Sequence, residues 1–517
     1  MCKQRHIKCD EGQPVCLRCQ RANRQCVYDS SQPQSQSQPP IPSDSQDPEL
    51  VISSTLQPRN HLAWPSPSSG ISPYASLELA ETSAIQHFAL NLGKELAGSF
   101  SNSVWCDVLP RVAQHEPSIW HGLVAVSTLD QNLRRDYVSH ERPPDRMAIM
   151  HYSKAMQKLQ TRLASAEESS CKDVVLLCCV LFAVFECLQS HYHSALLHIS
   201  GGIKLLVEWG GEGQLNNQVT LGSYLNRTML QSVFLSLDSQ AIQLGAPGFR
   251  DFSTRALDDQ FPIASFATIE NAHLMLNQIF HRLSQWGNWA EPVTVRGNKP
   301  NRERMLEEKQ RIKAQLGEWD VAFNRSLHLY DTQPATYLLL LQRSVMKAIL
   351  GKADDGSSEM EWDKYLPLFE ESVTHAEVYM RLTANSRTGA SRGTGLRPTQ
   401  SERPRPALTI AMDIVLPLFL ISTRCRDATV RGRALQVLRT CNRQEGIWNS
   451  WSCANIAAKV IEFEESAASE HGQIPDHARV YMLDIQFAEE QIAEVSLVVQ
   501  NENGYHRAVS MNEGVAC

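Results

Sequence analysis

Residues 2–26 read C-K-Q-R-H-I-K-C-D-E-G-Q-P-V-C-L-R-C-Q-R-A-N-R-Q-C, and this stretch decides how the chain begins to fold. Its cysteines are separated by six, six, two and six residues; they are Cys2, Cys9, Cys16, Cys19 and Cys26. Thiolates at such short, fixed spacings bind tetrahedral metal ions, zinc first among them. Because so short a segment cannot bury a core of its own, we predict that bound metal builds this part of the fold.

Basic residues are interleaved with these cysteines, at Lys3, Arg5, Lys8, Arg18, Arg21 and Arg24. A gap of six residues spans about two helical turns, so a short helix can lead from one ligand to the next and carry the basic side chains. Residues 1–28 have a net charge of +4, whereas the remainder of the chain has −11. A basic head on an acidic body indicates nucleic-acid contact at one end only.

The spacings and the basic pattern together resemble the fungal binuclear zinc cluster, whose pattern is C-x2-C-x6-C, a loop with a proline, and C-x2-C-x6-C. The five cysteines match the second to sixth ligands of that family, and Pro14 matches the loop proline. The resemblance implies two Zn²⁺ ions, bridged by the first ligand and by the fourth, which is Cys16. The first ligand is missing, so both sites are incomplete as written. We expect a truncated N-terminus, with a cysteine encoded two residues before Met1.

The resemblance also implies double-stranded DNA as the partner, with the first short helix in the major groove. Arg5 and His6 match the positions that read base edges in the family, and an arginine is suited to the O6 and N7 atoms of guanine. Lys8 and the three later arginines match positions that contact phosphate. The predicted DNA-binding residues are Lys3, Arg5, His6, Lys8, Arg18, Arg21 and Arg24. Family members favour short G/C-rich triplets and act in the nucleus with the transcription machinery.

Other readings of the cysteines fit less well. A disulfide framework is typical of short secreted domains, and this chain has 517 residues. A redox pair at Cys16 and Cys19 would need a βαβ context, which the surrounding sequence lacks. The nine cysteines of the body are scattered, which suits reduced thiols inside a cell.

Composition and periodicity predict a mainly α fold with a disordered linker between the head and the body. Residues 30–75 are rich in Ser, Pro and Gln and bury too little apolar surface to become ordered. Apolar residues then recur at helical spacing. The predicted helical segments are 77–96, 119–133, 147–163, 173–189, 194–209, 220–244, 266–286, 302–329, 335–350, 363–382, 408–425, 428–441 and 450–466. Residues 480–487 and 493–499 alternate weakly and predict a small C-terminal β-hairpin.

We therefore divide the chain into an incomplete zinc cluster (1–29), a linker (30–75), a helical body (76–500) and a tail (501–517). Gly, Pro and Arg are frequent in residues 384–406, which we expect to be a disordered insertion. The body resembles the fungal-specific regulatory domain that accompanies this cluster, most clearly over residues 417–438 and 443–448. A homodimer would be consistent with that resemblance, but the linker has no heptad run to support one.

The sequence gives no indication of an enzyme or of a membrane span. It has no G-x-S-x-G, H-E-x-x-H, G-x-x-x-x-G-K-[ST] or G-x-G-x-x-G motif. The longest apolar run, residues 174–185, is too short to cross a bilayer and predicts a buried helix. His191, His193 and His198 lie near Cys187, but satisfied histidines at a helix junction are commoner than a metal site.

We predict a sequence-specific transcription regulator of RNA polymerase II genes, of the kind that controls a metabolic or biosynthetic gene cluster. Two alternatives remain open. One is a truncated regulatory protein that acts through its helical body without binding DNA. The other is a helical enzyme with an accidental cysteine-rich end, which would need a deep pocket with converging ionisable groups.

Overall fold

The computed structural model describes residues 75–100, 104–135, 145–165, 171–210, 227–243, 263–290, 302–352, 358–388, 405–470, 472–487, 492–501 and 504–514. The chain divides into two units, Met1–Ser66 and Pro67–Cys517, and every described residue belongs to the second. The predicted zinc cluster and nearly all of the predicted linker lie outside the described residues. Within those residues, the second unit is built from helices and two small sheets.

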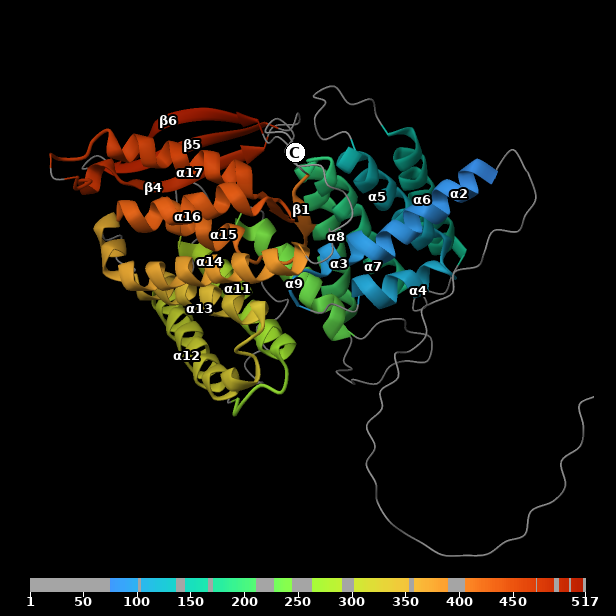
Figure 1. Cartoon of the computed structure of the whole chain (residues 1–517), viewed down its shortest axis with the longest axis horizontal. Helices are drawn as coiled ribbons and strands as arrows, with labels where there is room; N and C mark the ends of the chain where they lie inside the picture. The colour runs from blue at the N-terminus through green and yellow to red at the C-terminus, as the bar shows by residue number, and fades with distance from the viewer. Residues whose placement is uncertain are drawn as a thin grey trace, which may run out of the picture. The chain divides into compact units, whose positions relative to one another are not determined.

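The N-terminal part of this unit is a group of helices that pack largely on their neighbours in sequence (Figure 1). Helix α5 contacts α2, α6 and α7, while α8 contacts α7 and α9. The elements are α2 (Ala75–His87), the π-helix η2 (Phe88–Leu92), α3 (Gly93–Ala97), η3 (Val104–Val108), α4 (Leu109–Ala113), α5 (Pro117–Arg135), α6 (Arg146–Ser165), α7 (Lys172–Leu188), α8 (Tyr192–Gly210) and α9 (Arg227–Gln243). The apolar spacing predicts no helix where η3 and α4 lie, since both are short and Pro110 interrupts the pattern.

Helix α7 confirms the prediction of a buried helix for residues 174–185. From Val174 to Leu188 every side chain except that of Cys179 is buried, because the helix is apolar on all sides. It pairs with α8 through a tight turn at Ser190, whose φ of 62° is left-handed. Within the described residues, no helix is both long and apolar enough to span a membrane.

The C-terminal part adds a second group of helices around one large apolar core. Helix α13 contacts α11, α12 and α14, and α15, α16 and α17 contact one another. The elements are α11 (Ile269–Ala290), α12 (Arg302–Ser326), the 3-10 helix η5 (Leu327–Leu329), α13 (Pro334–Gly351), the 3-10 helix η6 (Glu359–Tyr365), α14 (Leu366–Thr388), α15 (Val415–Arg424), α16 (Ala428–Cys441) and α17 (Ser450–Glu465). The mainly α fold class is confirmed.

A small internal sheet corrects the expectation of one helix over residues 408–425. Strand β1 (Ala407–Thr409) pairs in parallel with β2 (Arg443–Glu445), and β2 pairs antiparallel with β3 (Trp448–Asn449). The helix predicted from residue 408 therefore begins only at Val415. Apolar residues at 408, 410, 412 and 414 are compatible with either a helix or a strand over so short a run. Figure 1 shows β1 where the two groups of helices meet.

The C-terminal hairpin is confirmed but has a third strand. Strands β4 (Val480–Phe487), β5 (Ile492–Asn501) and β6 (Gly504–Gly514) form an antiparallel sheet in that order, after the short 3-10 helix η7 (Asp476–Ala478). The residues that we assign to a tail, 501–517, include strand β6. Pairing with β5 makes this segment a strand, since the backbone ladder does not require apolar side chains.

The expected insertion at 384–406 also needs correction at its ends. Helix α14 continues to Thr388, and Arg405 is held by ion pairs to Asp130 of α5 and to Glu95 of α3. The side chain of Arg405 is only 4% exposed. The remaining residues, 389–404, lie outside the described residues.

Candidate functional site

The predicted zinc ligands and DNA-binding residues, 2–26, lie outside the described residues, so their arrangement stays a prediction. Within the described body, buried charge is concentrated at several places, and two of them lie around the C-terminal helices. One is the internal sheet, and the other is a pocket beside the start of β4.

The internal sheet carries a buried carboxylate that caps a helix. The side chain of Glu445 accepts hydrogen bonds from the backbone N–H groups of Asp413, Ile414 and Val415, at 2.8, 3.0 and 3.1 Å. These donors belong to the first turn of α15 or directly precede it, where a helix leaves N–H groups unpaired. Glu445 therefore fixes the position at which α15 begins.

Arg443 balances the charge of this cluster. Its guanidinium lies 2.7 Å from Asp413 and 3.6 Å from Glu445, and it also donates to the hydroxyl of Tyr379. Burial, together with the nearby Asp413 carboxylate, raises the pKa of Glu445 to about 7. Burial likewise raises the pKa of Asp413, against the pull of Arg443. The charged and polar groups of this cluster are buried and paired with one another, which suits a structural role.

Glutamine side chains tie this sheet to the surrounding helices. Gln240 of α9 donates to the carbonyl of Ile410 at 2.9 Å and accepts from the N–H of Ile447 at 3.1 Å. Gln342 of α13 donates to the carbonyl of Met412 at 2.6 Å, and Gln444 donates to the carbonyl of Cys187 at 3.1 Å. Helices from both groups therefore meet at the internal sheet.

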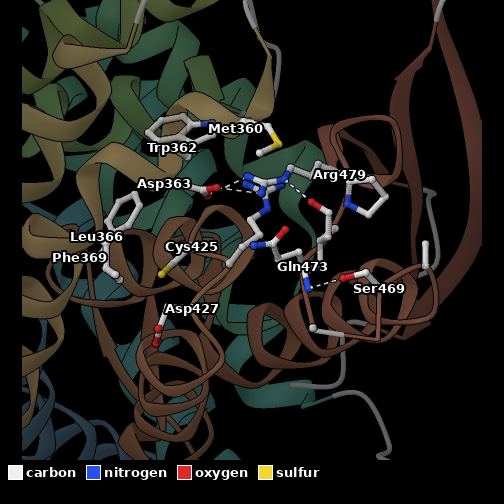
Figure 2. A pocket seen from close by; sticks show the side chains of 15 residues that line it. Met360, Trp362, Asp363, Leu366, Phe369, Cys425, Asp427, Ser469, Gln473 and Arg479 are labelled. Carbon is white, nitrogen blue, oxygen red and sulfur yellow. Dashed lines mark hydrogen bonds and ion pairs between the residues drawn. The ribbon is translucent and has the colours of Figure 1, made fainter.

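The pocket lies between η6, the link from α15 to α16, and the segment that leads into β4, and its volume is about 480 Å³ (Figure 2). That volume falls within the range of small-molecule sites. Its apolar lining comprises Met360, Trp362, Leu366, Phe369, Ile474 and Pro475. Its polar lining comprises Asp363, Arg426, Asp427, Ser469, Gln473 and Arg479.

Two arginines on the pocket wall are paired with carboxylates that differ in their exposure to solvent. Arg479 makes a bidentate ion pair with Asp363, at 2.8 and 2.9 Å, and its carboxylate partner is 43% exposed at the side chain. Arg426 faces inward and binds Glu464 at 2.7 Å, a carboxylate that is fully buried. Its guanidinium also donates to the backbone carbonyls of Arg424 and Val480.

Glu359 anchors the same region from the side of η6. Lys352, Arg424 and Arg426 lie 2.9, 3.1 and 3.6 Å from its carboxylate. Burial alone would raise the pKa of Glu359, but these cations hold it below its ordinary value. The carboxylate is therefore charged at neutral pH and fixes the arginines next to the pocket.

Two of the histidines near Cys187 have partners in neighbouring side chains. His191 is paired with Glu186 at 3.1 Å, and His198 lies 3.0 Å from the hydroxyl of Tyr152. No group of three or more His, Cys, Asp or Glu side chains within the described residues is arranged to hold a metal ion.

Sequence reasoning missed the pocket and its arginines. Asp363 and Arg479 are 116 residues apart in the sequence, so local periodicity carries no sign of their pairing. The available signal was the resemblance over residues 417–438, which include Cys425, Arg426 and Asp427 of the pocket lining.

Comparison with protein families matches residues 1–35 to the fungal Zn(2)-Cys(6) binuclear cluster domain. Residues 87–348 match the fungal specific transcription factor domain. The chain is 25% identical to the aspercryptin biosynthesis cluster-specific transcription regulator atnN of Emericella nidulans, over 97% of this chain and 93% of that protein. It is 68% identical over 25 residues to the adhesion and hyphal regulator 1 of Candida albicans, which is 5% of this chain and 4% of that protein. No solved structure is significantly similar to the chain.

Proposed function

The chain belongs to the fungal DNA-binding transcription regulators that combine a Zn(2)-Cys(6) cluster with a fungal specific transcription factor domain, and we propose that it controls a biosynthetic gene cluster. The observation that carries this proposal is the presence of both family matches in one chain, together with similarity along nearly the whole of a cluster-specific regulator. The gene cluster itself is proposed only by analogy with that relative.

The proposed head binds zinc through Cys2, Cys9, Cys16, Cys19 and Cys26, and reads DNA with Arg5 and His6. Thiolate ligands suit zinc, and the metal would hold two short helices in a fixed relation. Phosphate contacts from Lys8, Arg18, Arg21 and Arg24 would supply affinity with little choice of sequence, and Lys3 belongs to the same proposed DNA-binding set. The match to the zinc-cluster family over residues 1–35 supports this assignment.

The proposed body acts in the nucleus and passes regulation on to the transcription machinery. We take residues 76–500 as the regulatory domain and residues 30–75 as the linker. The extent of the second family match, 87–348, supports a regulatory rather than a catalytic body.

Deletion of the gene, followed by transcript profiling, tests the proposal. We expect a block of neighbouring genes to change expression together. A matched pair of variants at the native locus then separates DNA binding from action through the body: Cys19→Ser should reproduce the deletion, while Cys106→Ser, at an exposed free cysteine of η3, should not. Wild-type transcript levels in Cys19→Ser would favour the alternative of a regulator that acts without DNA binding.

A further inference from the structure

The pocket beside β4 lies outside the two segments that match known families. Its lining residues fall between Met360 and Arg479, whereas the second family match ends at residue 348. Three segments that are distant in sequence enclose it, so a molecule bound there would contact all three. The chemistry of the two walls indicates what kind of molecule the pocket accepts.

One wall of the pocket is apolar and contains an unsatisfied donor. Met360 and Trp362 of η6 both line the pocket; the side chain of Met360 is 46% exposed, whereas Trp362 is only 7% exposed. The indole Nε1 of Trp362 is buried without a hydrogen-bond partner among the described residues. The exposed apolar surface of this wall suits the apolar part of a ligand.

The facing wall presents a guanidinium whose outer partner is an exposed carboxylate. Arg479 is 4% exposed, and its Nε and Nη1 donate to the backbone carbonyls of Ile474 and Glu359, at 3.1 and 3.2 Å. These bonds fix the guanidinium of Arg479 in place, while its two Nη atoms donate to the carboxylate of Asp363. Figure 2 shows this pair in the middle of the pocket, with Met360 and Trp362 on one side and Gln473 on the other.

Asp363 differs from the other acids that hold arginines here, because it lies at the surface. Its side chain is 43% exposed, whereas Glu359 and Glu464 are 4% and 0% exposed. Because the side chain of Asp363 is partly exposed, its carboxylate can turn into solvent and be hydrated there, whereas the buried guanidinium of Arg479 still needs an anionic partner. Another planar carboxylate could then take the same bidentate position on Arg479.

We propose that this pocket binds an apolar organic acid, whose carboxylate replaces Asp363 on Arg479 and whose apolar part packs on Met360 and Leu366. In the free protein, the carboxylate of Asp363 occupies the position on Arg479 that the ligand carboxylate would take. The bound acid would join η6 and α14 to the segment that enters β4, where Arg424 and Arg426 already hold the carbonyl of Val480. Binding does not depend on DNA recognition, so it holds or fails separately from the proposed function.

Isothermal titration calorimetry of the purified full chain tests the proposal with 2-naphthoate as the probe and neutral 2-naphthamide as its matched control. We expect saturable binding of the acid and binding of the amide that is weaker by about tenfold or more, because a bidentate charged hydrogen bond is lost. Equal affinities for acid and amide, or no saturable binding of the acid, would overturn the proposal.

Substitutions on the same 3-10 helix make the test specific. Asp363→Asn should tighten binding of the acid by about threefold or more, since a competing carboxylate and its repulsion are removed. Glu361→Gln is the matched control, because Glu361 pairs with Lys364 and does not line the pocket, and it should leave the affinity unchanged. Weaker binding of the acid to Asp363→Asn would show that Asp363 is itself a ligand group, and would refute the exchange.

Arg479→Gln should remove the preference for acid over amide. Because Arg479 also holds two backbone carbonyls, its fold is checked by circular dichroism before titration. If the variant unfolds, the Asp363→Asn and Glu361→Gln pair still decides the outcome. A folded Arg479→Gln variant that keeps the full preference for the acid would refute the role of the guanidinium.

Discussion

Gly446, in the turn between β2 and β3, is the position where the structure predicts the largest effect of adding one methyl group. This residue has a φ of 59°, in the left-handed region that favours glycine. A Cβ atom added there would lie 2.0 Å from Oε1 of Gln240 and 2.8 Å from its Cδ. Because Gln240 is fully buried and hydrogen-bonded at both ends of its amide, it cannot move aside without losing those bonds. Gly446→Ala should therefore be strongly destabilising.

The magnitude comes from two separate costs. Left-handed backbone at a residue with a Cβ costs about 1 kcal/mol or slightly more. Displacing Gln240 leaves the carbonyl of Ile410 and the N–H of Ile447 buried without partners, at about 1–3 kcal/mol each. The sum is about 3–7 kcal/mol, which is a large part of the ~5–15 kcal/mol that stabilises a typical domain.

Urea unfolding of the full chain, followed by far-ultraviolet circular dichroism, measures this loss. Gly432→Ala is the matched control, since Gly432 lies inside α16 with no atom within 4 Å of an added Cβ, and it should stabilise by about 0.5–1 kcal/mol. In the double variant Gly446→Ala/Gln240→Ala the steric conflict is gone, so its loss should be smaller than the sum of the single losses. Unchanged stability of Gly446→Ala, or strict additivity, would show that Gln240 does not oppose a side chain at this turn.

Three further predictions concern the head and the pH dependence of the body. Removal of zinc with a chelator should abolish DNA binding while the helical circular dichroism signal persists, because all described helices belong to unit Pro67–Cys517; a large loss of helix would contradict this. Arg5→Ala should cost about 1–3 kcal/mol of binding and relax specificity at one base, while Arg21→Ala should weaken all sequences alike and lower the salt slope by about one; equal, sequence-independent losses would disprove the assignment. Burial, reinforced by His151, lowers the pKa of His121 from 6.5 to about 4, so the unfolded chain binds more protons between these values. The free energy of unfolding, measured with urea, should therefore fall as the pH drops from 6.5 to 4, and it should fall less in His121→Asn than in the wild type. The same dependence on pH in both proteins would exclude His121 as the cause.

Helices were predictable from the sequence because their apolar spacing is a local property. The predicted segment 428–441 coincides with α16, and 302–329 covers α12 and η5. The whole of α7 could be predicted from an apolar run that only burial can accommodate. Local spacing was therefore enough to predict the fold class.

The internal sheet was not predictable, because tertiary contacts determine it. The strand β2 reads R-Q-E, which has no strand propensity, and its side chains are all buried in partners from other helices. Arg443 depends on Asp413 and Tyr379, residues that lie 30 and 64 positions away in the sequence. The pocket could not be predicted from the sequence for the same reason, since Asp363 and Arg479 meet only in the folded body.

Chromatin immunoprecipitation of the protein, tagged at its C-terminus and expressed from its own locus, is the direct test of the proposed control of a gene cluster. We expect enrichment at promoters of a group of neighbouring genes, over sites with G/C-rich triplets. That enrichment should disappear in Cys19→Ser and persist in the matched variant Cys106→Ser. Absence of promoter enrichment in the wild type, or the same enrichment in Cys19→Ser, would show that the zinc-cluster head does not direct this protein to those genes.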